Sequence, residues 1–217
     1  FRVALAEGLS SWQVYKALSE IKFLSGKLEN IPDEGTIAPA SYDFVIGMTK
    51  EALIKKMQER QASILNEAWN ARQPNLPINT KQEALILASI IEKETSLKTE
   101  RGKVSSVFVN RLLREIALQT DASVVYGITR GKKVLGRGLR RSELKKDTPW
   151  NTYVNKGLPP SPIGNPGKAS IHAALNPDIT NYLYFVADGS GGHAFAENLR
   201  EHNINVAKWR KIEKTDN

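Results

Sequence analysis

The chain has 217 residues, of which 41% are hydrophobic and none is cysteine, and its formal net charge is +8. This length can bury a core and fits one large domain or a small domain followed by a larger one, and we expect the second. The lack of cysteine excludes disulfides, thiolate chemistry and cysteine-based zinc sites. The positive charge suits nucleic acid, an anionic membrane or a carboxylate-bearing cell wall, but equally a merely solvated surface.

The sequence has no apolar stretch of the roughly 18 residues that a membrane-spanning helix needs, and it opens without a signal-like segment. We therefore expect a soluble chain. Because it starts at Phe1 without an initiator methionine, we also expect a fragment of a longer, anchored or exported protein. Glycines interrupt the basic run 130–146, which indicates a loop, and we expect no nucleic-acid partner.

Residues 7–72 predict a small α/β module. Ser10 or Ser11 can cap a first helix, and the turn-rich stretch 32–39 follows it. A second, amphipathic helix covers residues 53–68.

Two prolines mark the end of this module. Pro74 and Pro77 lack the amide proton that a continuing helix would need. We therefore predict a first domain at 1–73 and a second at 74–217.

The second domain opens with two predicted helices. Asn79 or Thr80 can cap a helix from Lys81 to about Ser96, and another helix runs from about Thr99 to Glu115. The region 119–166 reads as a long irregular segment, which is usually either functional or disordered. Residues 182–186 and 193–195 predict a β-hairpin, and a basic helix follows from about Asn198. The expected fold class is α+β.

Glu94 is the most informative residue of the first of these helices. Each helical residue advances about 100°, so Glu94 shares the bulky apolar face with Leu87 and Ile90. Glu92 falls on the opposite side, beside Ser89. A carboxyl group held against apolar side chains has a raised pKa and can serve as a general acid. Helical phase alone leaves an alternative, in which Glu94 reaches water or pairs with Arg101 or Arg111.

Other polar residues carry weaker signals. Asp121 could be a second carboxylate, as in glycoside hydrolysis, or a turn or cap residue. The three histidines do not have the spacing of metal ligands, so we expect no metal and no cofactor. Pro159 and Pro160 begin a stiff, extended segment that could line a groove or form a surface loop.

Seven segments of the second domain form a recognisable pattern: LASIIEKET (87–95), ERGKVSSVFVNRL (100–112), LQTD (118–121), NTY (151–153), GLPPSPIGNPG (157–167), YLYFVADGSGGHAF (182–195) and EHN (201–203). They resemble the MltG (YceG-like) family of endolytic murein transglycosylases. Residues 33–35 and 39–42 resemble the LysM-like subdomain of that family more weakly. Asp121 is followed by Ala-Ser where the family has Pro-Thr, and Trp150 stands where Tyr often precedes Asn-Thr-Tyr.

The resemblance implies a small LysM-like subdomain followed by a lysozyme- or transglycosylase-like catalytic domain. It also implies a peptidoglycan lyase that an N-terminal helix, outside this chain, anchors to the inner membrane with its catalytic part facing the periplasm or outer side. Peptidoglycan glycan strands and peptidoglycan synthases are the expected partners. In lysozyme-like transglycosylases the catalytic glutamate precedes serine at a helix end, a pattern that Glu94-Thr95 matches better than Glu92-Lys93.

The expected reaction leaves 1,6-anhydro ends, with Glu94 as the catalytic acid and base. Arg101 and Arg111 are candidates for the carboxylates of lactyl groups or peptide stems. Two rivals stay open: a muramidase that uses Glu94 with Asp121, and a non-catalytic glycan-binding module. Candidates for substrate binding are Gln119, Thr120, Asp121, Asn151 and Tyr153. Pro159 and Pro160, in the extended segment Leu158–Ile163, are further candidates.

Overall fold

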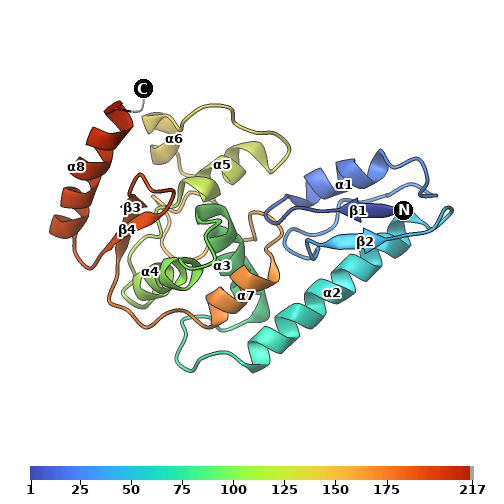
Figure 1. Ribbon diagram of the computed structural model, residues 1–217, viewed down its shortest axis with the longest axis horizontal. Helices are drawn as coiled ribbons and strands as arrows, with labels where there is room; N and C mark the ends of the chain where they lie inside the picture. Colours follow the sequence, from blue (N-terminus) through green and yellow to red (C-terminus); the bar gives the residue numbers. More distant parts are fainter. Residues whose placement is uncertain (216–217) are drawn as a thin grey trace.

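A computed structural model describes residues 1–215. It combines helices with two small antiparallel sheets, which confirms the predicted α+β class (Figure 1). Its elements in chain order are β1 (Arg2–Ala4), α1 (Ser11–Ser19), β2 (Ser41–Asp43), α2 (Lys50–Asn70), α3 (Lys81–Glu94), α4 (Arg101–Leu113), α5 (Asp121–Thr129), α6 (Arg141–Lys145), α7 (Lys168–Leu175), β3 (Tyr184–Ala187), β4 (His193–Ala196) and α8 (Leu199–Thr215).

The first part of the chain packs α1 and the N-terminal half of α2 against the β1–β2 pair. Ser10 and Gln13 form a reciprocal capping box at the start of α1, as the sequence predicts for Ser10. The strands pair with Val3 opposite Tyr42. The sequence did not locate these strands, because each has only three residues and shows no clear alternation.

Helix α2 takes part in two separate hydrophobic cores. Leu53 and Met57 belong to the core of the first part, whereas Leu65 and Ala68 belong to the core that surrounds α3. The helix ends at Asn70, before Pro74, as predicted. The division into 1–73 and 74–217 stays a prediction, but α2 makes a continuous helical link between the two cores.

Helix α3 is the central element of the second core. Thr80 caps it, and the Glu83 side chain reaches back to complete the capping box. Every residue from Ala84 to Ile91 is buried, because α2, α4, α5 and α7 all contact this helix. A helix that is buried on all sides carries its C-terminal residues into the interior of the fold. Glu94 is the last residue of α3.

The region 119–166 is not irregular throughout, which corrects the sequence prediction. It contains α5 and the short α6, and α7 follows it. In α5, Val124, Val125 and Thr129 are β-branched and Gly127 is flexible, so intrinsic helix propensity is low. Packing against α3 supplies the stabilisation that the local sequence lacks.

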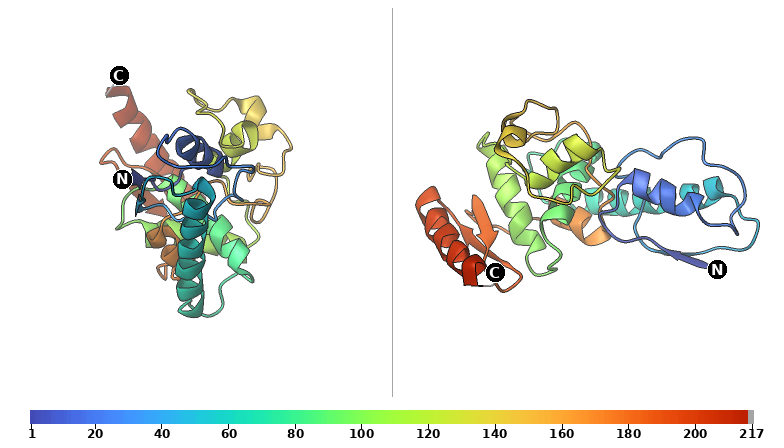
Figure 2. Two further views of the ribbon diagram at one scale, coloured as in Figure 1. Left: turned by 90° about the vertical axis from the view of Figure 1, so that its right-hand side faces the viewer. Right: turned by 90° about the horizontal axis from the view of Figure 1, so that it is seen from above.

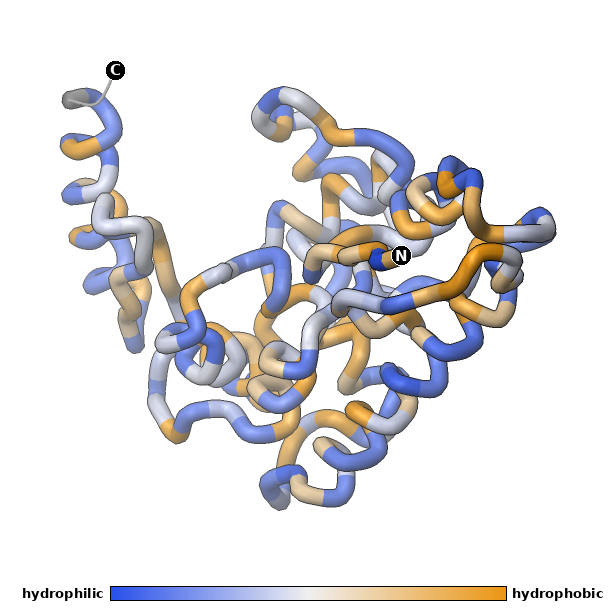
Figure 3. The backbone as a smooth tube through the Cα atoms, turned by 45° about the vertical axis from the view of Figure 1, so that its right-hand side comes forward, coloured by the Kyte–Doolittle hydropathy of each residue, from blue (hydrophilic) through white to orange (hydrophobic). Residues whose placement is uncertain are grey.

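The predicted hairpin and C-terminal helix are both present. The antiparallel strands β3 and β4 pair with Phe185 opposite Phe195, and α8 packs on them at the far end from the N-terminus (Figures 1 and 2). Figure 3 shows α8 as a mainly hydrophilic helix. Within residues 1–215, none of the helices combines the length and apolar character needed to cross a membrane.

Candidate active site

Glu94 lies on the wall of a pocket of about 200 Å³. Helices α3 and α4, the loop between α4 and α5, the start of α5, the loop after α6 and strand β3 all contribute to this pocket. The lining residues are Glu94, Phe108, Arg111, Leu118, Gln119, Thr120, Asp121, Tyr153 and Phe185. The pocket therefore joins residues that the sequence separates by almost a hundred positions.

The Glu94 carboxyl group is largely desolvated. Burial raises its pKa, and the nearby charge of Asp121 raises the pKa further, while a hydrogen bond from Thr120 and the field of His193 oppose the rise. The Thr120 hydroxyl donates this bond to Glu94 Oε1. Neither Arg101 nor Arg111 forms an ion pair with Glu94 among the described residues, so the pairing alternative is not the one adopted.

Hydrogen bonds among three hydroxyl-bearing residues hold Thr120 in the pocket wall. The Thr120 amide donates to Thr152 Oγ1 at 3.0 Å, and the Ser123 and Thr152 hydroxyls lie 2.9 Å apart. The amide of Gln119, whose φ of 54° is left-handed, donates to the Thr152 carbonyl at 3.0 Å. These contacts hold the Thr120 hydroxyl in the orientation that meets Glu94.

A second carboxylate shares the pocket. The Tyr153 hydroxyl donates to Asp121 Oδ1 at 2.6 Å, and burial together with this bond raises the pKa of Tyr153. The sequence left Asp121 open as a turn or cap residue. It begins α5, and its side chain faces the same space as Glu94. The pocket therefore holds two carboxyl groups.

Arg111 lines the pocket, but backbone carbonyls occupy its guanidinium. Its Nε donates to the Leu183 carbonyl at 2.7 Å, and Nη1 donates to the carbonyls of Ala117 and Leu118 at 3.0 Å each. Burial lowers the pKa of its guanidinium. Arg111 thereby ties the loop before α5 to the β-hairpin.

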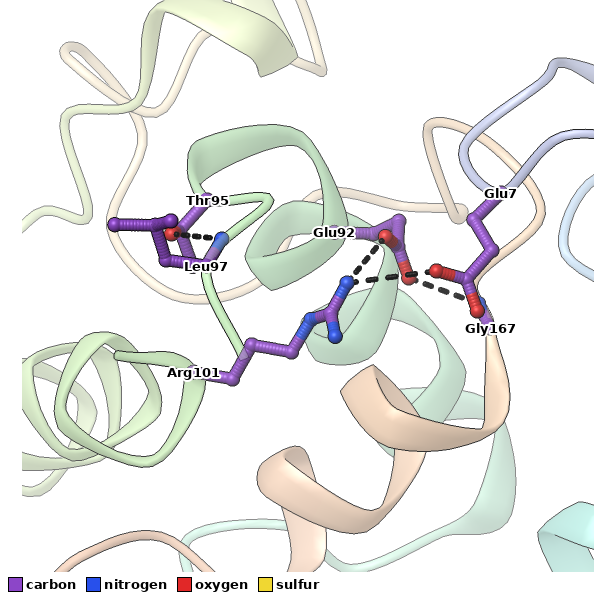
Figure 4. A network of polar contacts seen from close by, with 6 residues as sticks. All are labelled: Glu7, Glu92, Thr95, Leu97, Arg101 and Gly167. Atoms are coloured by element: carbon purple, nitrogen blue, oxygen red, sulfur yellow. Dashed lines mark hydrogen bonds and ion pairs between the residues drawn. The ribbon is translucent and has the colours of Figure 1, made fainter. Parts of the chain in front are cut away.

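Glu92 lies opposite Glu94 on α3, as helical phase predicts, but the polar surface expected on that side is instead a buried contact. Its side chain is only 5% exposed and pairs with Arg101 at 3.3 Å, and it accepts the Gly167 amide at 2.9 Å (Figure 4). Arg101 also meets Glu7 at 3.4 Å. The side of α3 opposite Glu94 faces another part of the protein rather than water, because α7 and the segment before it cover that side. Arg101 is buried in this network and lies outside the Glu94 pocket.

Three of the predicted substrate-binding residues lie outside the pocket lining. Asn151 is fully buried, and its amide donates to the carbonyls of residues 143, 144 and 146. Pro159 is buried and Pro160 is exposed, and neither lines the pocket. The segment they begin runs inward, where the Ile163 amide donates to Ser89 Oγ at 3.0 Å. Sugar binding by these three residues stays a prediction.

The chain is similar to a family of known proteins along nearly its whole length. The YceG-like family matches residues 1–208, which is nearly the whole chain. The chain belongs to the YceG-like family. The endolytic murein transglycosylase of Bacillus subtilis (strain 168) is 39% identical over 179 residues, covering 82% of this chain and 48% of that protein. The endolytic murein transglycosylase of Streptococcus pneumoniae serotype 2 (strain D39 / NCTC 7466) is 34% identical over 182 residues, covering 81% and 32%.

A solved structure is also similar. The crystal structure of a yceG-like protein from Listeria monocytogenes matches with a TM-score of 0.74 and 28% identity, covering 94% of this chain and 75% of that one. This YceG-like chain thus has the fold of its family. It spans about half the length of the Bacillus relative and about a third of the Streptococcus relative.

The apolar walls of the pocket in this YceG-like chain were not predicted. Phe108, Leu118 and Phe185 surround the Glu94 carboxyl. Phe185 lies on a predicted strand, where successive side chains point to opposite faces of the sheet. The sequence therefore does not tell which of the two faces carries Phe185. Among the described residues, no group of three or more His, Asp or Glu side chains is arranged to hold a metal ion.

Proposed function

We propose that this chain is the catalytic part of an endolytic lytic transglycosylase that cleaves the bond between N-acetylmuramic acid and N-acetylglucosamine in peptidoglycan strands. The observation that carries the proposal is the desolvated Glu94 carboxyl with a raised pKa, held by Thr120 at the wall of a pocket. The printed names of the Bacillus and Streptococcus relatives support the same substrate class.

In the first step, neutral Glu94 donates its proton to the glycosidic oxygen. The bond between that oxygen and C1 of the muramic acid breaks, and positive charge develops on the muramyl ring. The raised pKa of Glu94 keeps the proton available near neutral pH. The Thr120 hydroxyl donates to the carboxylate that this step leaves behind.

In the second step, the Glu94 carboxylate removes the proton from the C6 hydroxyl of the same muramyl sugar. The C6 oxygen bonds to C1 and closes a 1,6-anhydro ring, and Glu94 regains its proton. No water is consumed. The negative charge of Asp121, held by Tyr153, lies in the same pocket and would favour the positive muramyl ring.

A muramidase is the second candidate function, and Asp121 in the Glu94 pocket favours it. Hydrolases of glycosides commonly use two carboxyl groups, one as acid and one as base or nucleophile. In that case water attacks C1 and the product carries a reducing end. Mass spectrometry separates the two functions, because an anhydro end is lighter than a reducing end by one water molecule.

The test compares two glutamates of one helix. Glu94→Gln keeps the side-chain shape but cannot donate a proton, so we expect the release of muropeptides from purified sacculi to fall by at least about 100-fold. Glu92→Gln should retain most activity. Its effect should be a loss of stability of about 3 kcal/mol, because buried Arg101 loses a charged partner.

Circular dichroism of both variants serves as the folding control. Undiminished product release by folded Glu94→Gln protein would exclude Glu94 as the catalytic acid of either reaction. Retention of sacculus binding by the wild-type chain without any cleavage would instead support a non-catalytic glycan-binding module.

Anchoring and partners concern the whole protein. We propose an inner-membrane anchor outside this chain, with residues 1–217 on the periplasmic or outer side, where peptidoglycan strands and their synthases meet. Fractionation of the full-length protein tests the anchor, and co-purification of a synthase with full-length protein tests the partnership.

A further inference from the structure

A second pocket, of about 260 Å³, lies along α5 and is lined by other residues of this helix than the Glu94 pocket. It is close to the lower limit of about 300 Å³ for small-molecule sites, so it suits a short segment of a larger ligand. Its lining residues are Ser10, Gln13, Lys93, Ala122, Val125, Tyr126, Thr129, Gly131, Lys133, Val134, Leu135 and Ile163. We call it the α1–α5 pocket.

Specific contacts between the segment before α1 and the turn after α5 build this pocket. The Ser10 hydroxyl donates to the Gly131 carbonyl at 2.7 Å. Gly131 has a φ of +66°, and a Cβ there would lie 2.4 Å from the Ser10 Cβ, so only glycine fits the contact. On the α5 side, Ala122, Val125, Tyr126 and Thr129 form one helical face.

Apolar walls and two cations define the chemistry of the α1–α5 pocket. Val125, Leu135 and Ile163 supply apolar surface, and Lys93 and Lys133 supply positive charge. Neither lysine forms an ion pair among the described residues. Burial lowers the pKa of Lys93, and the charges of Glu34 and Glu92 oppose this only in part. A ligand with small alkyl groups and a carboxylate would complement this lining.

The carboxylates nearest to Lys93 are held by other groups. Glu34 accepts the Ser11 amide at 2.7 Å and the Tyr126 hydroxyl at 3.0 Å, and Glu92 pairs with Arg101. The Lys93 ammonium is therefore not neutralised by direct contact.

Two elements connect this pocket with the catalytic one. Lys93 precedes Glu94 directly at the end of α3, and α5 carries Asp121 at one pocket and Val125 at the other. A strand whose sugars occupy the Glu94 pocket would bring its substituents to this neighbouring site. Arg101 and Arg111, the residues expected to meet stem carboxylates, are instead occupied by Glu92 and by backbone carbonyls.

We propose that the α1–α5 pocket binds a carboxylate-bearing peptide stem of the glycan strand, with Lys133 and Lys93 facing the carboxylate and α5 contacting the small alkyl side chains. This inference rests on the proposed function for the identity of the strand. It makes stem peptides a determinant of substrate choice, recognised separately from the sugars.

The chain offers a matched pair of lysines for the test. Lys132 and Lys133 are exposed neighbours in the same loop, and of the two only Lys133 lines the pocket. We expect Lys133→Glu to raise KM for stem-bearing strands about tenfold, with no change for strands stripped of their stems by an amidase. Lys132→Glu, which changes the net charge equally, should leave the ratio of the two substrates at the wild-type value.

Isothermal titration of a synthetic stem tetrapeptide gives an independent readout. Its Kd should rise about tenfold in Lys133→Glu and stay unchanged in Lys132→Glu, and a peptide with amidated carboxylates should bind wild type as weakly as the acidic peptide binds Lys133→Glu. Equal effects of the two variants, or no binding of the acidic peptide to wild type, would overturn the inference. If wild type cleaves neither strand, the proposed function fails, while the titration still decides the pocket.

Discussion

Glu92 and Glu94 are separated by one residue in α3 but meet different surroundings. Glu92 faces Arg101 and the Gly167 amide, which stabilise a charged carboxylate. Glu94 faces Phe108, Leu118 and Phe185, which disfavour charge. Helical phase separated the two residues correctly. It did not reveal that protein atoms enclose most of both carboxyl groups, because phase describes direction and not what lies in that direction.

The desolvation of Glu94 predicts a pH-dependent cost in stability. Its pKa is raised by folding, so below the pKa of the unfolded chain both states are protonated and no cost arises. As the pH rises, the unfolded state ionises first, and stability falls until the folded-state pKa is passed. Glu94→Gln removes this cost, and its melting temperature should exceed that of wild type by at least about 2 °C at pH 8.

Differential scanning fluorimetry of both proteins from pH 4 to pH 8 measures this difference. The gap should close towards pH 4, where Glu94 is protonated in either state. A gap that is constant across this range would show that desolvation of the carboxylate is not its cause.

At the scale of elements, the sequence predicted the helix with clear capping residues, α3, but not the helix without them, α5. Thr80 and Glu83 cap α3, and the helix begins where the sequence predicts. Helix α5 has no side-chain cap and a sequence rich in β-branched residues, so its helical state depends on packing against α3. The loop that follows α6 is fastened to the end of that helix by the buried Asn151 amide.

Asn151 gives a test of that loop. It is fully buried and donates to three backbone carbonyls, so Asn151→Ala should lower the free energy of unfolding by about 2–4 kcal/mol. Asn181→Ala, at an exposed position, should be nearly neutral. Urea denaturation measures both. A fully stable Asn151→Ala protein with a raised KM would instead support direct sugar binding.

At the scale of the whole molecule, the segment after Ile163 joins the two cores. The Gly8 amide donates to the Asn165 carbonyl at 2.9 Å, and the Asn165 amide donates to the Leu9 carbonyl at 2.8 Å. The Asn165 side chain accepts the Ile37 amide at 2.9 Å. The proline- and glycine-rich segment that the sequence presented as a groove wall or surface loop is therefore a buried connection between distant parts.

Close backbone approach makes Gly164 critical for this connection. A Cβ at Gly164 would lie 2.8 Å from the Gly8 carbonyl oxygen, which cannot move without breaking the hydrogen bonds on either side. Gly164→Ala should lower the free energy of unfolding by about 2 kcal/mol.

Gly138 is the matched control, because a Cβ there meets nothing within 4 Å. Gly138→Ala should be neutral or slightly stabilising. Urea midpoints compare the two variants, and equal midpoints would mean that the two cores do not depend on this contact.

The sequence by itself determined the α+β class, the main helices, the hairpin and the direction of Glu94 on α3, because capping residues and apolar periodicity are local and α3 carries both. Only the tertiary structure decided what surrounds them. It brought Asp121, Tyr153 and Phe185 to Glu94, buried Glu92 with Arg101, and turned the segment after Pro160 inward. These outcomes depend on contacts between residues far apart in the chain, whose energies no local pattern contains.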